Sequence, residues 1–302
     1  MNVFCAVRNS FGVVWKNLIL VQPFILFLLV FSILSGGLSR VQSSPLYFFI
    51  FSTLLLLLII AFLSGWFYMA KKTIAFEMCE NLSPEEKAVK SFGLIKHFLP
   101  GVGEYFLPML GFGIFYLIIF LGVSLCTFKL GMTLIGAPNF DLTAINAAAT
   151  DAAKLQAYFA SLPTEQTKTL AYWFMLVSST GMLFQFVTTW WLPALFYNTK
   201  NPFKALGHGL KFLSKHFLGS ICVYFVLGIL NFIVSFVNSA LTGNIIFALI
   251  GLLLFFYYAT YYVVLLFLYY GQNGESSAKD YINSGNDCDG QKLAGGESGT
   301  ED

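Results

Sequence analysis

The chain has 302 residues, of which 57% are apolar, 18% aromatic and only 11% charged. Soluble domains carry roughly 25% charged residues, so this composition excludes a water-soluble globular fold, which could not cover so much apolar surface. The formal net charge of +2 says little by itself, and we expect no nucleic-acid partner.

Six apolar runs are long enough to cross the roughly 30 Å hydrocarbon core of a bilayer as helices. They cover residues 18–34, 46–70, 105–128, 170–197, 217–241 and 245–270. None of them contains Asp, Glu, Lys, Arg or His. We therefore predict an all-α integral membrane protein with six transmembrane helices in one polytopic membrane domain, residues 1–270.

The first run also resembles a secretory signal peptide, because Arg8 and Lys16 precede it. Its apolar stretch is longer than the roughly 7–15 residues of such a signal, so we predict a retained helix. The five cysteines have no spacing typical of a disulfide framework or of metal ligands. We expect neither a metal nor a cofactor.

The distribution of Lys and Arg predicts the topology, because basic residues in short loops tend to stay cytoplasmic. The amino terminus, the second and fourth connections and the C-terminal tail together carry 13 of them. The opposite side carries four, at Arg40, Lys129, Lys154 and Lys168. We therefore predict a protein integral to the bacterial inner (plasma) membrane with both termini cytoplasmic.

Residues 201–217, NPFKALGHGLKFLSKHF, have the pattern of a basic amphipathic helix. Asn201 and Pro202 are suited to an N-cap and a first helical turn. One side of the predicted helix carries Phe203, Leu206, Leu210, Leu213 and Phe217, and nearly the opposite side carries Lys204, His208, Lys211 and Lys215. Such a helix is expected to lie in the cytoplasmic interface of the membrane.

Two earlier segments have similar features. Residues 83–99 begin with Ser83-Pro84-Glu85-Glu86, a capping box, and residues 3–18 carry an apolar stripe at helical spacing. Lys16, Lys96 and Lys215 each stand just before a span. This pattern predicts three repeats, each an interfacial amphipathic helix followed by a two-span hairpin. The alternative is that any polytopic protein places Lys-rich amphipathic segments on its cytoplasmic side.

Two segments lie outside the predicted spans. The external loop, residues 129–169, contains an Ala-rich stretch that predicts a helix over about 142–161, either a surface cap or a lid over a cavity. Residues 271–302 are rich in Gly, Ser, Asn and carboxylates, and we expect a disordered acidic cytoplasmic tail.

Polar residues at membrane depth are the usual pointers to function. Here they are uncharged, and the candidates are Gln185, Asn231 and Tyr258. Hydrogen bonding between helices explains them as well as a ligand site does. Helix kinks are expected at Pro23, Pro108 and Pro193, which lie within spans.

Catalytic candidates are few, and we predict no catalytic residue. Glu77, Glu80 and Glu104 fall near predicted cytoplasmic helix ends, and Glu104 is expected to pair with Lys96 or His97. No phosphate-binding loop, zinc-protease motif or nucleophile elbow is present.

The segment from Asn201-Pro202-Phe203 to Lys215-His216-Phe217, and the similar lead-in before the first span, resemble a group of six-helix bacterial membrane proteins. This group includes the membrane domain that accompanies some glycerophosphodiester phosphodiesterases. The resemblance covers residues 1–270 and implies a six-helix membrane fold. It implies no activity, because that membrane domain has none to transfer and no segment outside the spans is long enough for the phosphodiesterase barrel.

Three hypotheses about function follow. The first is a non-enzymatic membrane protein that binds lipid or a membrane-protein partner, with anionic headgroups held at the cytoplasmic face. Its candidate lysines are Lys87, Lys90, Lys96, Lys204, Lys211 and Lys215. The second is a transporter or channel for a small uncharged or amphipathic solute, with Gln185, Asn231 and Tyr258 lining its cavity. The third, an integral-membrane enzyme, requires the three glutamates and a histidine to converge.

Overall fold

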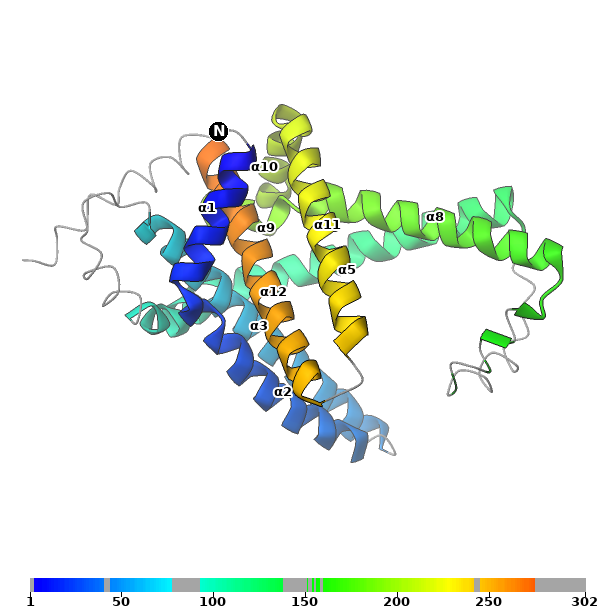
Figure 1. The fold of residues 1–302 in the computed structure, drawn as a ribbon, viewed down its shortest axis with the longest axis horizontal. Helices are drawn as coiled ribbons and strands as arrows, with labels where there is room; N and C mark the ends of the chain where they lie inside the picture. The colour runs from blue at the N-terminus through cyan, green and yellow to red at the C-terminus, as the bar shows by residue number, and fades with distance from the viewer. Residues whose placement is uncertain are drawn as a thin grey trace, which may run out of the picture. The chain divides into compact units, whose positions relative to one another are not determined.

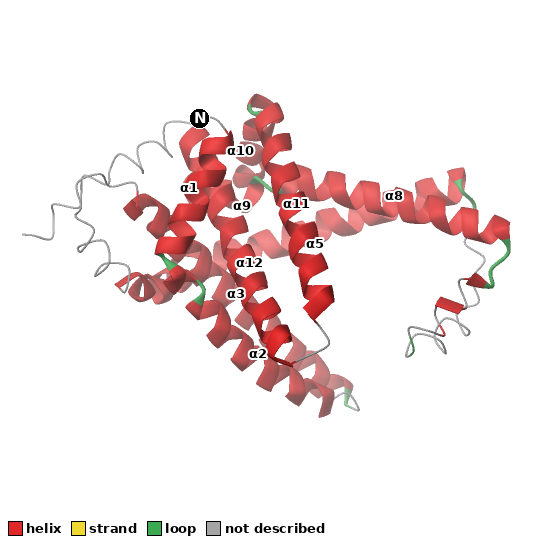
Figure 2. Ribbon diagram, in the orientation of Figure 1, coloured by secondary structure: helices red, strands yellow, loops and turns green. Residues whose placement is uncertain are grey.

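The computed structural model describes residues 3–40, 44–77, 93–137, 160–241 and 245–274, together with residues 151, 154, 156 and 157. Within these residues the secondary structure is helical, without strands (Figure 2). Six of the helical segments are long and apolar enough to cross a membrane. The all-α prediction and the prediction of six membrane-spanning segments are therefore confirmed at that level.

The first predicted span corresponds to α2 (Gln22–Arg40), which follows α1 (Val3–Lys16) and the short 3-10 helix η1 (Leu18–Leu20). The next two correspond to α3 (Pro45–Glu77) and α5 (Phe98–Leu134), the latter preceded by the 3-10 helix η2 (Leu94–His97). The fourth is divided between α8 (Thr164–Thr188) and α9 (Trp191–Tyr197), and α10 (Pro202–Lys215) follows it. The last two are α11 (Phe217–Leu241) and α12 (Ile245–Asn273).

Several helices are longer than the apolar runs that predicted them. Helix α3 continues to Glu77 rather than Ala70, α5 begins at Phe98 and continues to Leu134, and α12 includes the first residues of the predicted tail. Hydropathy marks only the part of a helix that matches the hydrocarbon. The extensions are helical turns that carry polar residues such as Lys71 and Glu104.

The fourth span is interrupted at Thr189 and Trp190. Pro193 explains the break, because it has no N–H to bond the carbonyl of residue 189 and its ring crowds that carbonyl. Pro193 itself lies in the first turn of α9, where a missing N–H is tolerated. Pro23 likewise lies in the first turn of α2, whereas Pro108 lies inside α5.

The chain divides into two compact units, residues 1–112 with 189–302, called here the core unit, and residues 113–188, called the hairpin unit. At the centre of the core unit three phenylalanine rings meet, one each from α3, α9 and α12. The ring centroids of Phe67, Phe196 and Phe267 are 5.5–6.0 Å apart in each pair. Phe196 and Phe267 are almost fully buried.

The helices that precede the spans pack in a consistent order within the core unit. Helix α1 packs against α12, η2 packs against α3, and α10 packs against α9. Figure 1 shows α1, in blue, lying alongside α12, in orange. Each short helix therefore contacts the second span of a hairpin other than the one it leads into.

Helices α1 and α10 bury residues at the same spacing. Helix α1 buries Ala6, Ser10, Val13 and Val14, and α10 buries Ala205, Gly209, Phe212 and Leu213. Other large apolar side chains on both helices are exposed, with Phe11 and Phe203 more than half exposed. Small residues allow close approach of the helix axes, which is how helices pack in membranes.

Burial in the core unit is concentrated toward one end of the spans. In α12, most residues from Ile246 to Phe255 are exposed, whereas those from Val263 to Gly271 are buried. In α3, the buried residues begin at Ile60 and extend to Ile74. The packed end of both helices is the end that the Lys and Arg distribution predicts to be cytoplasmic.

The hairpin unit consists of residues 113–134 of α5 and helix α8. Phe184 contacts the rings of Tyr116 and Phe120, with centroids 5.2 and 5.7 Å apart. Trp173 lies against Gly131 and donates a hydrogen bond of 3.1 Å from Nε1 to the Gly136 carbonyl. The predicted helix over 142–161 lies mostly outside the described residues, as do most of the predicted tail and the capping box at Ser83–Glu86.

Candidate functional site

The start of helix α10 is held by side-chain hydrogen bonds. The Asn201 side chain accepts hydrogen bonds from the backbone N–H groups of Phe203 and Lys204, at 3.0 and 3.3 Å, as the predicted N-cap requires. The Trp191 indole donates a 2.7 Å hydrogen bond to the Pro202 carbonyl. This clamp fixes the start of α10 against α9.

Close backbone contact continues along the helix at Gly209. A Cβ atom at this position would lie 3.0 Å from backbone atoms of Trp190 and Trp191. The Phe212 ring contacts the rings of Trp190 and Tyr270, with centroids 4.9 and 4.5 Å apart. These contacts bring the basic side of α10 next to the C-terminal end of α12.

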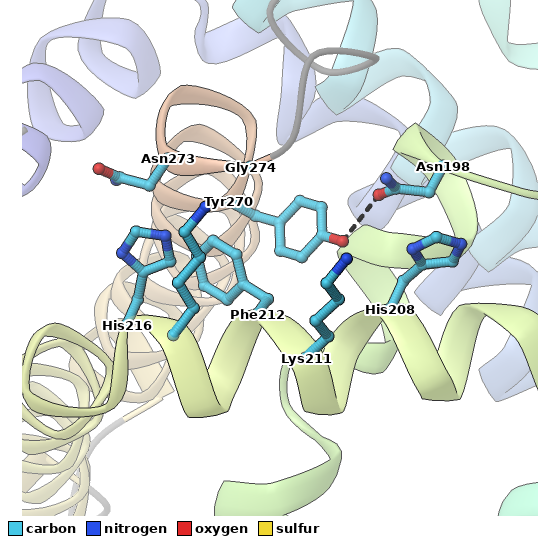
Figure 3. Close-up of a pocket in the computed structure, with 9 residues that line it drawn as sticks. Asn198, His208, Lys211, Phe212, His216, Tyr270, Asn273 and Gly274 are labelled. Atoms are coloured by element: carbon cyan, nitrogen blue, oxygen red, sulfur yellow. Dashed lines mark hydrogen bonds between the residues drawn. The ribbon is translucent and has the colours of Figure 1, made fainter.

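A small pocket opens between α10, the end of α12 and the residue that caps α9. Its basic side chains are those of His208, Lys211, Lys215 and His216. Figure 3 shows Lys211 and His216 rising from α10 on the side of Tyr270 and Asn273 of α12, and His208 rising toward Asn198. The Tyr270 hydroxyl donates a 2.7 Å hydrogen bond to Oδ1 of Asn198 at the back of the pocket.

The enclosed space of this pocket is about 20 Å³. That volume exceeds only slightly the roughly 10–15 Å³ that one water molecule requires. A whole metabolite would not fit within it. The pocket can recess one small polar group while the rest of a ligand stays outside.

His216 is both a pocket residue and the C-cap residue of α10. Burial of the imidazole and the positive charge of Lys215 lower the pKa of His216 below its ordinary value of 6.5, against a hydrogen bond to the Asn273 backbone that raises it. The Nε2 atom is buried and has no hydrogen-bond partner among the described residues. An unpaired buried nitrogen is unfavourable.

A second polar cluster, centred on Lys71 of α3, is structural. Lys71 is only 6% exposed, and its ammonium group donates a 2.6 Å hydrogen bond to the Phe196 carbonyl in the last turn of α9. It also lies over the rings of Tyr105 and Tyr197, 6.0 and 5.3 Å from their centroids. The lysine therefore satisfies a helix terminus and joins α3 to α9.

The candidate lysines are distributed differently in the structure. Lys211 and Lys215 line the pocket, and Lys204 is exposed on the same helix outside it. Lys96 is exposed in η2, beside the start of α5. Lys87 and Lys90 lie outside the described residues.

The intramembrane polar candidates are not brought together within one unit. Gln185 is exposed on α8 in the hairpin unit, and Asn231 is exposed on α11 in the core unit. The Tyr258 hydroxyl donates a 3.0 Å hydrogen bond to the Leu227 carbonyl of α11. This bond gives Tyr258 a role in packing α12 against α11.

The catalytic candidates make structural contacts. Glu77 accepts a 2.9 Å hydrogen bond from Asn17. Glu104 forms an ion pair with Lys200 at 3.0 Å, rather than with the expected Lys96 or His97. Glu80 lies outside the described residues. In the part of the chain that the structure describes, no group of three or more His, Cys, Asp or Glu side chains is placed to hold a metal.

Sequence reasoning missed the pocket residues contributed by α9 and α12. Asn198, Tyr270 and Asn273 are distant from α10 in sequence and carry no charge, so no local pattern marks them. His216 is not among the candidates that the sequence pattern gives. The signal that could have found it is its place directly after Lys215, where a helix end needs a cap.

Comparison with protein-family models, with curated proteins and with solved structures found no match.

Proposed function

We propose that this chain is a non-enzymatic, multi-pass protein of the bacterial inner membrane that binds anionic lipid headgroups at its cytoplasmic face. The observation that carries the proposal is the arrangement of α10. Its small residues pack against α9, while Lys204, Lys211 and Lys215 remain exposed together with Phe203 and Leu210. Exposed lysines beside exposed large apolar side chains suit the boundary between headgroups and acyl chains.

The proposed orientation has both termini in the cytoplasm. It rests on the excess of Lys and Arg on that side of the chain. Burial in the core unit is concentrated at the end of the spans that this orientation places in the cytoplasm. At this end the Trp66 indole N–H donates a hydrogen bond to the Leu20 carbonyl. A tryptophan N–H bonded near a helix end is typical of a membrane interface.

We further propose that the chain consists of three diverged repeats. The equal spacing of buried residues in α1 and α10 supports this, as do Ala6 and Ala205 at the start of each pattern and Lys16 and Lys215 at its end. The contacts between the leading helices and the spans are also cyclic: α1 contacts α12, η2 contacts α3 and α10 contacts α9. A threefold arrangement requires this order. The Phe67, Phe196 and Phe267 rings would then surround its axis.

The lipid-binding proposal is tested in reconstituted vesicles. Tryptophan fluorescence is measured with brominated phosphatidylglycerol or brominated phosphatidylcholine as the quencher, which yields the relative affinity of the protein for the anionic lipid. Each basic residue near an anionic surface contributes about 1 kcal/mol. Replacing Lys204, Lys211 and Lys215 together by Gln should therefore weaken the preference for phosphatidylglycerol by roughly 100-fold.

The matched control replaces Lys129 and Lys168, which are exposed on the predicted external side. This change should leave the preference within about twofold of the original when the protein is inserted in one orientation and the brominated lipid is confined to the leaflet at its cytoplasmic face. An unchanged preference in the triple variant would show that α10 does not bind anionic lipid.

A further inference from the structure

Three exposed lysines form a stripe along α10, called here the α10 stripe. They are Lys204, Lys211 and Lys215. Lys211 and Lys215 are one helical turn apart, and Lys204 lies two turns before Lys211, so all three project from the same side of the helix. At a rise of about 1.5 Å per residue, the stripe extends over roughly 16 Å. Residues 201–217 contain no Asp or Glu, so α10 supplies no carboxylate of its own to these lysines.

Helix α12 ends beside this stripe. The backbone N–H of Gly274 donates a 2.8 Å hydrogen bond to the Tyr270 carbonyl, which continues the helical bonding of α12 by one residue. Gly274 lines the same pocket as Lys211 and Lys215. Figure 3 shows Asn273 and Gly274 at the end of α12, above Lys211 of α10. The chain therefore continues from a point next to the α10 stripe.

The residues that follow, 275–302, are called the tail here, and they are opposite in charge to the stripe. They contain seven carboxylates and two lysines. The first carboxylate, Glu275, follows Gly274 directly, and Asp280 comes five residues later. Five residues span at most roughly 17 Å of extended chain, which matches the length of the α10 stripe. The carboxylates of Glu275 and Asp280 are therefore within reach of its lysines.

We propose that residues 275–280 bind the α10 stripe of the same chain and compete there with anionic lipid. The proposal rests on the proposed function, because that function gives the lysines of the stripe their lipid ligand. Carboxylates and the phosphates of lipid headgroups both form charge-assisted hydrogen bonds with ammonium groups. Each lysine that the tail engages is withdrawn from the headgroups, so the tail limits the affinity of α10 for the membrane surface.

The short connection makes this contact effective although its parts are weak. An exposed pair of a carboxylate and a lysine stabilises little by itself. A connection of a few residues, however, holds the carboxylates at an effective concentration of about a millimolar or more beside the stripe. A contact that is formed about 70–90% of the time leaves roughly a third to a tenth of the molecules free to bind lipid, which lowers the apparent affinity by about three- to tenfold.

Direct contact is tested by cross-linking with a carbodiimide, which joins a carboxylate to a lysine amine as an amide with loss of water. The full chain is treated in phosphatidylcholine vesicles, and the cross-linked peptides are quantified by mass spectrometry. Glu275 and Asp280 should couple to the α10 stripe at least fivefold more often than to Lys96, an exposed lysine of η2 on the same predicted cytoplasmic side. In vesicles that contain phosphatidylglycerol, coupling to the stripe should decrease.

Competition is tested with brominated lipid, as for the proposed function, and with two tail variants. The double variant Glu275→Gln with Asp280→Asn should strengthen the preference for phosphatidylglycerol by about three- to tenfold. The matched control, Glu297→Gln with Asp302→Asn, makes the same change of charge farther along the chain, where a longer connection lowers the effective concentration at the stripe. It should change the preference less than twofold.

The outcomes separate this proposal from the proposed function. Equal coupling to Lys96 and to the α10 stripe, or equal effects of the two tail variants, would overturn the tail contact and leave lipid binding by α10 intact. Coupling that stays the same when phosphatidylglycerol is present would overturn the competition. If the original chain showed no preference for phosphatidylglycerol, the proposed function would fail together with the competition, and the cross-linking arm would still decide whether the tail binds α10.

Discussion

Replacement of Gly209 by Ala is expected to destabilise the protein, whereas the same change at Gly207 on the same helix is expected to stabilise it. A Cβ at Gly209 would lie 3.0 Å from backbone atoms of Trp190 and Trp191, and a Cβ at Gly207 would meet nothing within 4 Å. Carbon atoms prefer separations of about 3.5–4.0 Å, so at Gly209 the helices α9 and α10 must move apart by roughly half an ångström.

The magnitude follows from two opposing effects. Removing a glycine from a helix interior contributes about 0.5–1 kcal/mol of stability in both variants. Overpacking at Gly209 costs about 1–3 kcal/mol, because the neighbouring atoms belong to the backbone and cannot rotate away. The difference between the two variants cancels the helix-propensity contribution and should be about 1–3 kcal/mol.

The assay is thermal unfolding followed by tryptophan fluorescence in detergent, at one scan rate for all variants because unfolding of such proteins is often irreversible. A difference of 1–3 kcal/mol corresponds to roughly 3–10 °C between the midpoints of Gly209→Ala and Gly207→Ala. If the two variants were stabilised equally, the close contact between α9 and α10 would not exist in the protein. The positions of Lys211 and His216 next to α12, which depend on that contact, would then also be wrong.

Three further predictions address other contacts. At the crossing of α3 and α5, a Cβ on Gly101 would lie 2.6 Å from a side-chain atom of α3, whereas a Cβ on Gly103 would meet nothing within 4 Å. Gly101→Ala should therefore lower the midpoint of thermal unfolding, and Gly103→Ala should raise it. Lys71→Met removes a buried, charged hydrogen bond to the last turn of α9 and should cost about 1.5–3 kcal/mol in thermal unfolding. The lowered pKa of His216 means that the folded protein binds fewer protons than the unfolded chain, so this residue's contribution to stability is complete above about pH 6.5 and is lost as the pH falls. The variant His216→Asn should show a smaller decrease in unfolding midpoint between pH 7.5 and pH 5, and an equal decrease would contradict the assignment.

The sequence predicted the elements of the fold because the signals for them are local. A charge-free apolar run specifies a membrane-spanning helix by itself, and all six runs lie in such helices. Asn201 followed by Pro202 specifies a helix start, and the amide makes the predicted capping bonds. The interruption at Thr189 was less accessible, because Pro193 predicts a kink without indicating that the helix stops.

The packed face of the amphipathic helices could not be predicted from the same pattern. The stripe of large apolar residues that includes Phe203 and Leu210 indicates the side that avoids water. In a membrane, acyl chains solvate that side as well as another helix would, so close contacts form where the side chains are small. Helix α10 therefore makes its close backbone contact at Gly209 and leaves Phe203 exposed, while of the predicted stripe Leu213 is buried.

Partners that are distant in sequence were also beyond local reasoning. Glu104 was expected to pair with a cation a few residues away, and it pairs instead with Lys200. Lys71, which was counted only as a topology signal, satisfies a carbonyl of α9. Lys71 reaches the Phe196 carbonyl where α3 and α9, the second spans of two different hairpins, meet through the Phe67 and Phe196 rings.

The bilayer as solvent also explains why polar bonds between helices gather at the packed end of the core unit. Apolar contact between helices gives little net stabilisation in lipid, so bonds that satisfy helix ends decide how the helices are held together. Lys71 satisfies the end of α9, Asn17 joins the end of α1 to α3, and Tyr270 joins α12 to the cap of α9. The junction of α10 with α12 differs from these, because the Nε2 of His216 has no partner among the described residues.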